Sequence, residues 1–141
     1  SAKAYGPALA AMANGSINWT TDTIKVALCT SAYTPDQDAH DFFNDVTNEV
    51  TGTGYTAGGA TLGSKTSAYT GGTNTTALDA ADTTWSASTI TARYAIIYKS
   101  TGTAATSPLI GWVDFGADVV SSAGNFTITW DAGGIFTLNT P

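Results

Sequence analysis

The chain has 141 residues, of which 43% are hydrophobic and 11% are charged, and its formal net charge is −6 at pH 7. This length and apolar content predict one globular domain and exclude a disordered tail. The five lysines and arginines are scattered and form no basic stripe, so nucleic acid is not an expected partner. The acidic balance also disfavours an anionic membrane surface.

Cysteine usage and the apolar runs narrow the class of protein further. A single cysteine, Cys29, excludes an intramolecular disulfide, so stability has to come from packing, metal or association. No apolar run approaches the roughly 18 residues of a transmembrane helix. The run Leu9–Ala13 is too short for the hydrophobic region of a signal peptide, so we expect no secretion signal and no membrane partner.

Residues 4–13 are the only stretch with a helical pattern. Tyr5, Leu9 and Met12 recur at helical spacing, and Asn14-Gly15 is a typical helix stop. A short alanine-rich helix is marginal in water and needs a surface to lie on. That surface is either the chain's own β-structure or a neighbouring subunit, and Tyr5, Leu9 and Met12 are therefore candidate interface residues.

The remainder of the chain is predicted to be β-structure, organised around the run Ile90–Tyr98. This run is rich in β-branched and aromatic residues and contains no glycine or proline. Alternation places Tyr94, Ile96 and Tyr98 on one face and Ala95 with Ile97 on the other. We expect a central strand, covered largely on one side and partly on the other.

Shorter strand-like runs, separated by turn residues, precede and follow this central strand. The predicted runs are Ser16–Trp19, Thr23–Thr30, Asn48–Thr51, Thr61–Tyr69, Thr75–Ala80, Thr83–Trp85, Leu109–Phe115, Asn125–Asp131 and Ile135–Leu138. Gly111 within one of them is expected to mark a bulge or a close backbone contact. About eight or nine short antiparallel strands predict an all-β sandwich or barrel. We divide the chain into an N-terminal helical arm, residues 1–15, and a β-domain, residues 16–141.

The densest polar cluster, residues 36–45, contains several aspartates and the only histidine, His40. It loosely resembles a calcium loop, but the EF-hand pattern requires a mid-loop glycine and a glutamate at its twelfth position, which are missing. We favour the interpretation that Asp38 caps a helical turn over residues 39–45 and that the carboxylates solvate the loop. His40 is predicted to be solvated, and Cys29 to be a small buried hydrophobe. No metal or other cofactor is expected.

Paired carboxylates for glycoside hydrolysis would have to come from aspartates at predicted strand ends or turns. These are Asp79, Asp82, Asp114, Asp118 and Asp131. Aspartate at such positions usually accepts hydrogen bonds from the backbone. The sequence also lacks the Gly-x-Ser-x-Gly turn of serine hydrolases and a phosphate-binding glycine loop in its usual context. We therefore expect a protein that is not an enzyme.

Four tryptophans and six tyrosines raise the alternative of a carbohydrate-binding surface. Trp130 and Tyr94 alternate with apolar neighbours and are predicted to be core residues. Trp85, set among threonine and serine, and Tyr55, in a glycine-rich loop, are the better candidates for exposure. Packing in the core or at an interface is still the favoured role for the aromatic residues as a set.

Several segments resemble a family of small virion proteins of tailed bacteriophages and their prophages. The resemblance covers nearly the whole chain. It is carried by Thr23–Thr30, by residues 33–62 with their aspartate-rich Phe42-Phe43 turn and Gly54-Tyr55-Thr56-Ala57-Gly58-Gly59, by Ala92–Tyr98 and by Trp130–Leu138.

The resemblance implies a non-enzymatic structural protein made in the cytoplasm of a bacterial host and present in many copies on the virion. Within that class we expect a head decoration (cement) protein on the capsid exterior, with the major capsid protein and copies of itself as partners. Homo-oligomers are also expected. The alternative is a tail, fibre or host-attachment protein whose Tyr55 and Trp85 bind surface glycans.

Overall fold

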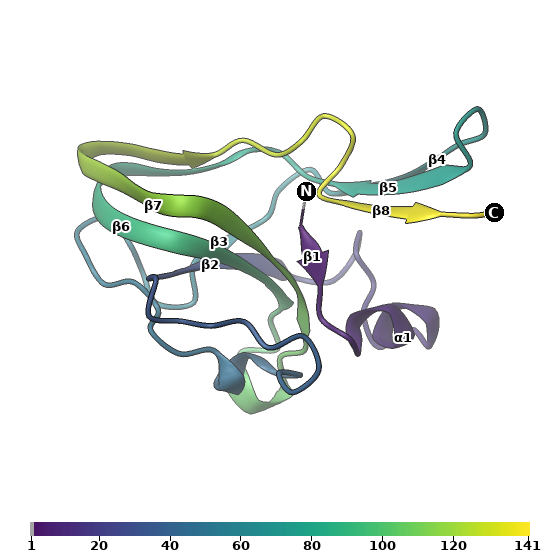
Figure 1. The fold of residues 1–141 in the computed structure, drawn as a ribbon, viewed down its shortest axis with the longest axis horizontal. Coiled ribbons are helices and arrows are strands. Elements are labelled where there is room, and N and C mark those ends of the chain that lie inside the picture. Colours follow the sequence, from purple (N-terminus) through teal and green to yellow (C-terminus); the bar gives the residue numbers. More distant parts are fainter. Residues whose placement is uncertain (1) are drawn as a thin grey trace.

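A computed structural model describes residues 2–141 and contains two antiparallel sheets and one short α-helix, shown in Figure 1. The larger sheet has the strand order β1-β7-β6-β2-β3, and the smaller sheet has the order β4-β5-β8. The strands are β1 (Lys3–Ala4), β2 (Ile24–Cys29), β3 (Ala60–Thr61), β4 (Thr66–Thr70), β5 (Thr75–Asp79), β6 (Thr83–Lys99), β7 (Leu109–Ile128) and β8 (Phe136–Asn139). The helix α1 is Ala8–Ala13, and two 3₁₀ turns are η1 (Phe43–Asp45) and η2 (Ala104–Thr106). The predicted all-β fold is confirmed, in its sandwich-like form and not as a closed barrel.

The strands β6 and β7 form one long antiparallel hairpin of 17 and 20 residues. The prediction of only short strands is therefore wrong here. Thr83–Trp85 and Ile90–Tyr98 both lie in β6, whereas Leu109–Phe115 and most of Asn125–Asp131 lie in β7. The residue types of Ser121–Gly124 predict a turn, but this stretch lies within β7. The buried Ser88 hydroxyl lies 2.8 Å from the Ser121 hydroxyl and donates to the Gly124 carbonyl oxygen at 3.0 Å, which satisfies these polar groups inside the sheet.

The hairpin bends at a large irregularity in β7. Ala92 pairs with Val119 and Tyr94 with Asp114, so β7 has extra residues at this point, including Gly116 with a φ of +83°. Such a bulge bends and twists a strand, and β7 turns back on itself in Figure 1. Both ends of the hairpin consequently contribute side chains to the same hydrophobic core.

The five-stranded sheet is covered on both faces. The first core cluster includes Ile24, Val26, Leu28, Ile97, Trp85, Phe126 and Phe136. The second cluster, on the opposite face, consists of Tyr5, Ala27, Cys29, Tyr33, Ile96, Tyr98, Leu109 and Trp112. The predicted alternation of the central strand is confirmed, as is the burial of Cys29. The second face is more completely covered than expected, because residues of the loop after β2 pack against it.

The N-terminal segment is helical only from Ala8 onward. The helix predicted over residues 4–13 is wrong in its first turn, because Lys3 and Ala4 pair with Trp112 and Gly111 of β7. A Cβ at Gly111 would lie 2.4 Å from the Lys3 carbonyl oxygen, so this glycine is the close backbone contact that the sequence indicated.

The smaller sheet begins where a single predicted strand, Thr61–Tyr69, is interrupted. The structure places Ala60–Thr61 in the larger sheet and Thr66–Thr70 in the smaller one. Between them Ser64 adopts a φ of +51°, a left-handed conformation that breaks a strand. No helix within residues 2–141 combines the length and the hydrophobicity needed to cross a membrane.

Candidate interaction surface

The five residues predicted to form an interface do not lie together. Leu9 is 58% exposed and Met12 is half-buried, both on α1. Tyr5 and Trp85 are buried, at 1% and 6% exposure, and Tyr55 is half-buried. The prediction that Trp85 and Tyr55 are the exposed aromatic residues is therefore wrong. Thr84 and Ser86, the neighbours of Trp85 on β6, are exposed, while the Trp85 ring packs in the core.

Tyr55 fastens the glycine-rich loop to strand β2. Its hydroxyl accepts a hydrogen bond from the Leu28 backbone N–H at 3.0 Å and donates one to a Glu49 carboxylate oxygen at 2.6 Å. Burial, together with the bond to Glu49, raises the pKa of Tyr55. The ring lies 6.0 Å from that of Trp85. Tyr55 thus satisfies a backbone group at the edge of β2 and is not a free platform for a ligand.

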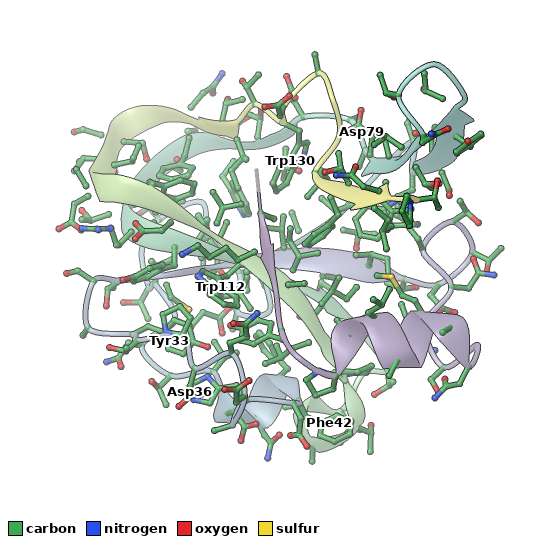
Figure 2. All side chains as sticks on the ribbon, turned by 45° about the vertical axis from the view of Figure 1, so that its right-hand side comes forward. Tyr33, Asp36, Phe42, Asp79, Trp112 and Trp130 are labelled. Carbon is green, nitrogen blue, oxygen red and sulfur yellow. The ribbon has the colours of Figure 1, made fainter. Side chains whose placement is uncertain are left out.

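Tyr5 belongs to a row of hydrogen-bonded aromatic rings beneath the aspartate-rich loop, where Figure 2 marks Tyr33, Asp36 and Trp112. The Tyr5 and Tyr33 hydroxyl oxygens are 2.9 Å apart, and the Tyr33 hydroxyl lies 3.0 Å from His40 Nδ1. The Tyr5 ring also packs on Trp112, with 4.7 Å between centroids. His40 stacks on Tyr33 and is half-buried, so its predicted position in solvent is wrong.

The aspartates of this loop bind their own backbone. Asp36 Oδ1 accepts hydrogen bonds from the N–H groups of Asp38 and Ala39, and Asp45 Oδ2 accepts one from Asp41. These bonds hold the pKa values of Asp36 and Asp45 below their usual range. The capping carboxylates are therefore Asp36 and Asp45 in place of the predicted Asp38. Within residues 2–141 no three histidine, cysteine or acidic side chains converge as metal ligands.

A hollow of about 340 Å³ lies between the glycine-rich loop and the end of β6, and its lining includes Lys25, Glu49 and Tyr98. The Tyr98 hydroxyl donates to the Gly58 carbonyl oxygen at 2.7 Å. Glu49 already accepts from Tyr55 and from the Gly58 backbone. The Glu49 carboxylate and the Tyr98 hydroxyl, which line this hollow, consequently hold the glycine-rich loop in place.

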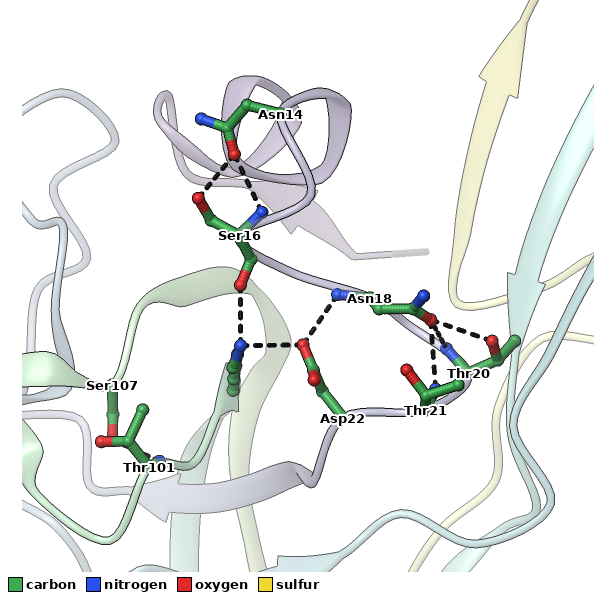
Figure 3. A network of polar contacts seen from close by, with 9 residues as sticks. Asn14, Ser16, Asn18, Thr20, Thr21, Asp22, Thr101 and Ser107 are labelled. Carbon is green, nitrogen blue, oxygen red and sulfur yellow. Dashed lines mark hydrogen bonds and ion pairs between the residues drawn. The ribbon is translucent and has the colours of Figure 1, made fainter.

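The segment that follows α1 is tied to the end of β6, as Figure 3 shows around Ser16, Asn18 and Asp22. The Lys99 ammonium donates to the Ser16 carbonyl oxygen at 2.7 Å and lies 3.0 Å from the Asp22 carboxylate. The Asn18 side chain accepts from the backbone N–H groups of Thr20 and Thr21. These turns replace the strand predicted over 16–19 and fix the position of α1.

An apolar groove lies between α1 and the smaller sheet. It consists of two adjoining hollows of about 220 and 450 Å³. Four apolar residues line both hollows: Leu9, Met12, Leu78 and Leu138. We call this feature the α1 groove. Among residues 2–141 no charged side chain lines either hollow, although the chain carries a net charge of −6, so the groove is suited to an apolar protein surface.

The α1 groove includes residues that the sequence did not single out. Helical spacing identified Leu9 and Met12, but Leu78 and Leu138 come from β5 and β8. Alternation along a strand indicates only which residues of that strand share a sheet face. No local signal shows that this face lies opposite α1, because the two elements are distant in sequence.

Beyond the groove, β4 forms an open edge of the smaller sheet. All five of its residues are exposed, Tyr69 to 59%, and within the described part of the chain it pairs with β5 alone. Ser67 of β4 also lines the larger hollow of the α1 groove. Groove and edge therefore form one continuous surface on this side of the molecule.

Comparison of the chain with protein-family models, with curated proteins and with solved structures finds no match.

Proposed function

We propose that this chain is a structural protein of a bacteriophage particle, attached to the outside of the capsid, where it binds neighbouring major capsid subunits. The observation that carries this proposal is the α1 groove, an uncharged apolar surface displayed by a chain that is otherwise acidic. Burial of apolar area against a protein partner, multiplied over many copies, gives affinity without a ligand pocket. The sequence resemblance to small virion proteins supports the same role.

The glycan-binding alternative has less support. It depended on Tyr55 and Trp85 as exposed platforms on which sugar rings stack. Trp85 is buried and the Tyr55 hydroxyl is engaged with Glu49 and Leu28. To meet a sugar, Trp85 would have to leave the core and Tyr55 would have to give up these hydrogen bonds.

The test is binding of the purified chain to capsids of the parent particle that lack it. We expect saturable, stoichiometric binding and a higher temperature of capsid disruption. Leu9→Asp places a charge in the α1 groove and is expected to weaken binding at least about tenfold, since an unpaired charge is costly to bury. Val120→Asp is the matched control, because Val120 is 66% exposed on β7 and lies outside the groove.

Two outcomes would overturn the proposal. One is the failure of the folded wild-type chain to bind these capsids at all. The other is equal binding by the wild type and Leu9→Asp, which would mean that the α1 groove does not contact the capsid.

A further inference from the structure

The backbone of β4 has unused hydrogen-bonding groups. In an antiparallel strand, successive residues direct their N–H and C=O groups to opposite sides. The carbonyl oxygens of Leu78, in β5, and of Asn74, just before it, accept hydrogen bonds from Ile135 and Thr140, which flank β8. Because successive residues alternate, the backbone groups of Ala77 point the other way, toward Ala68 of β4. By the same alternation Ser67 and Tyr69 direct their backbone groups away from the sheet.

β4 also lacks the features that usually protect a sheet edge. Edge strands are commonly short, bulged, or interrupted by proline or charged side chains. β4 reads Thr-Ser-Ala-Tyr-Thr and pairs with β5 in an uninterrupted register. The outer strands of the larger sheet, β1 and β3, have two residues each. At the opposite edge of the smaller sheet, the Ile135 carbonyl before β8 accepts from Ala2.

We propose that two copies of this chain associate through β4, antiparallel about a two-fold axis, and join their smaller sheets into one. Full overlap of Thr66–Thr70 with its copy places Ala68 opposite Ala68. Ser67 then lies opposite Tyr69 of the second copy, and these two residues exchange backbone N–H···O=C hydrogen bonds. The two-fold axis repeats the same pair, with Tyr69 of the first copy opposite Ser67 of the second. The self-complementary register favours a second copy over an unrelated peptide, because a two-fold contact uses the same patch twice.

The side chains fit this register. Directly opposed residues of an antiparallel pair project from the same face, so Tyr69 of the second copy stands beside Ser67, at the mouth of the α1 groove. This contact would cover an aromatic ring that is 59% exposed in the single chain. No residue of β4 is charged, so the net charge of −6 does not place like charges directly opposite one another at the contact.

The experiment measures the mass of the full chain by sedimentation between about 10 µM and about 1 mM, the range in which weak association becomes visible. We expect the mass to rise from one chain to two. Ser67→Pro removes one outward N–H without touching the bonds to β5, and is expected to weaken association at least about tenfold. Thr137→Pro is the matched control, because Thr137 is exposed and faces outward on the other edge of the same sheet.

Amide hydrogen exchange in the wild type supplies a second readout that does not depend on a variant. The Ser67 and Tyr69 amides are expected to gain protection as concentration rises, whereas those of Ala68 and Thr70, bonded to β5, are protected throughout. A single-chain mass at every concentration would overturn the inference. So would loss of association in Thr137→Pro but not in Ser67→Pro, or exchange of Ser67 and Tyr69 that stays concentration-independent. This inference does not rest on the capsid role, and neither test decides the other.

Discussion

The two sheets differ in how they use the same strand-forming chemistry. In β2, at the centre of the molecule, all residues but Lys25 are buried, and one face belongs to each core cluster. In β4, at the periphery, all five residues are exposed. The aliphatic strand specifies the fold through burial on both faces, whereas the hydroxyl-rich strand leaves its edge and one aromatic ring exposed. In our proposals, stability depends on the larger sheet and recognition on the smaller one, and the predictions below test that division.

Alkaline pH is expected to have the largest effect, and to act on the larger sheet. Burial raises the pKa of Tyr33 and of Tyr98 to about 12, from an ordinary 10.0. Because the folded chain holds these groups neutral, their contribution to stability is complete below pH 10 and is lost as the pH rises from 10 to 12. Burial likewise raises the pKa of the Cys29 thiol to about 12.

Urea unfolding at a series of pH values, followed by tryptophan fluorescence, measures this loss. We expect the free energy of unfolding to fall steeply above pH 10, together with the appearance of phenolate absorbance. Tyr33→Phe should make that fall less steep. A free energy of unfolding that stays constant between pH 10 and 12 would contradict the burial of these rings.

The second prediction compares two leucines. Leu28 is 0% exposed in the core, and Leu9 is 58% exposed on α1. Leu28→Ala is expected to lower the free energy of unfolding by about 2–5 kcal/mol, because it removes buried methyl groups and leaves a cavity. Leu9→Ala is expected to change it by no more than about 0.5 kcal/mol. Comparable losses in the two variants, measured by urea unfolding, would show that α1 is part of the stabilising core.

The third prediction compares two tyrosine hydroxyls. Tyr55→Phe leaves the Leu28 N–H without its acceptor and removes one of the two hydrogen bonds that Glu49 Oε1 accepts, which costs about 1–3 kcal/mol for a buried polar group. Tyr69→Phe removes an exposed bond to Asn74 and is expected to cost no more than about 0.5 kcal/mol. The same unfolding measurement serves both variants, and a Tyr55→Phe chain as stable as the wild type would refute the role of this hydroxyl.

Local patterns in the sequence predicted the larger sheet well. Alternation from Tyr94 to Tyr98 gave the correct two faces, because each face of that part of the strand meets a core cluster. Gly111 was identified as a bulge or close contact because a glycine inside a strand pattern is itself a local signal, although Lys3, the residue that it meets, is distant in sequence. Such features depend on neighbouring residues and can be read from a single sequence.

The surface was harder to predict because it depends on contacts between distant segments. Trp85 was expected to be exposed from its threonine and serine neighbours, yet β6 continues past it and turns it toward Phe126. Ser121–Gly124 was predicted to be a turn, yet it lies inside β7, where the Ser121 hydroxyl meets that of Ser88, 33 residues earlier. The α1 groove requires β8 to lie beside a helix near the opposite end of the sequence, and no periodicity reports that placement.

The smallest effect is expected from calcium, which tests how the second face of the larger sheet is covered. The loop over that face is held by Asp36 and Asp45, whose carboxylates already accept backbone hydrogen bonds. A calcium site saturated 100-fold above its Kd would add about 2.7 kcal/mol, enough to raise the melting temperature by several degrees. We expect no measurable shift in millimolar calcium, and the same result in magnesium as the control. A rise with calcium alone, abolished by Asp36→Asn, would mean that an ion and not the backbone organises this loop.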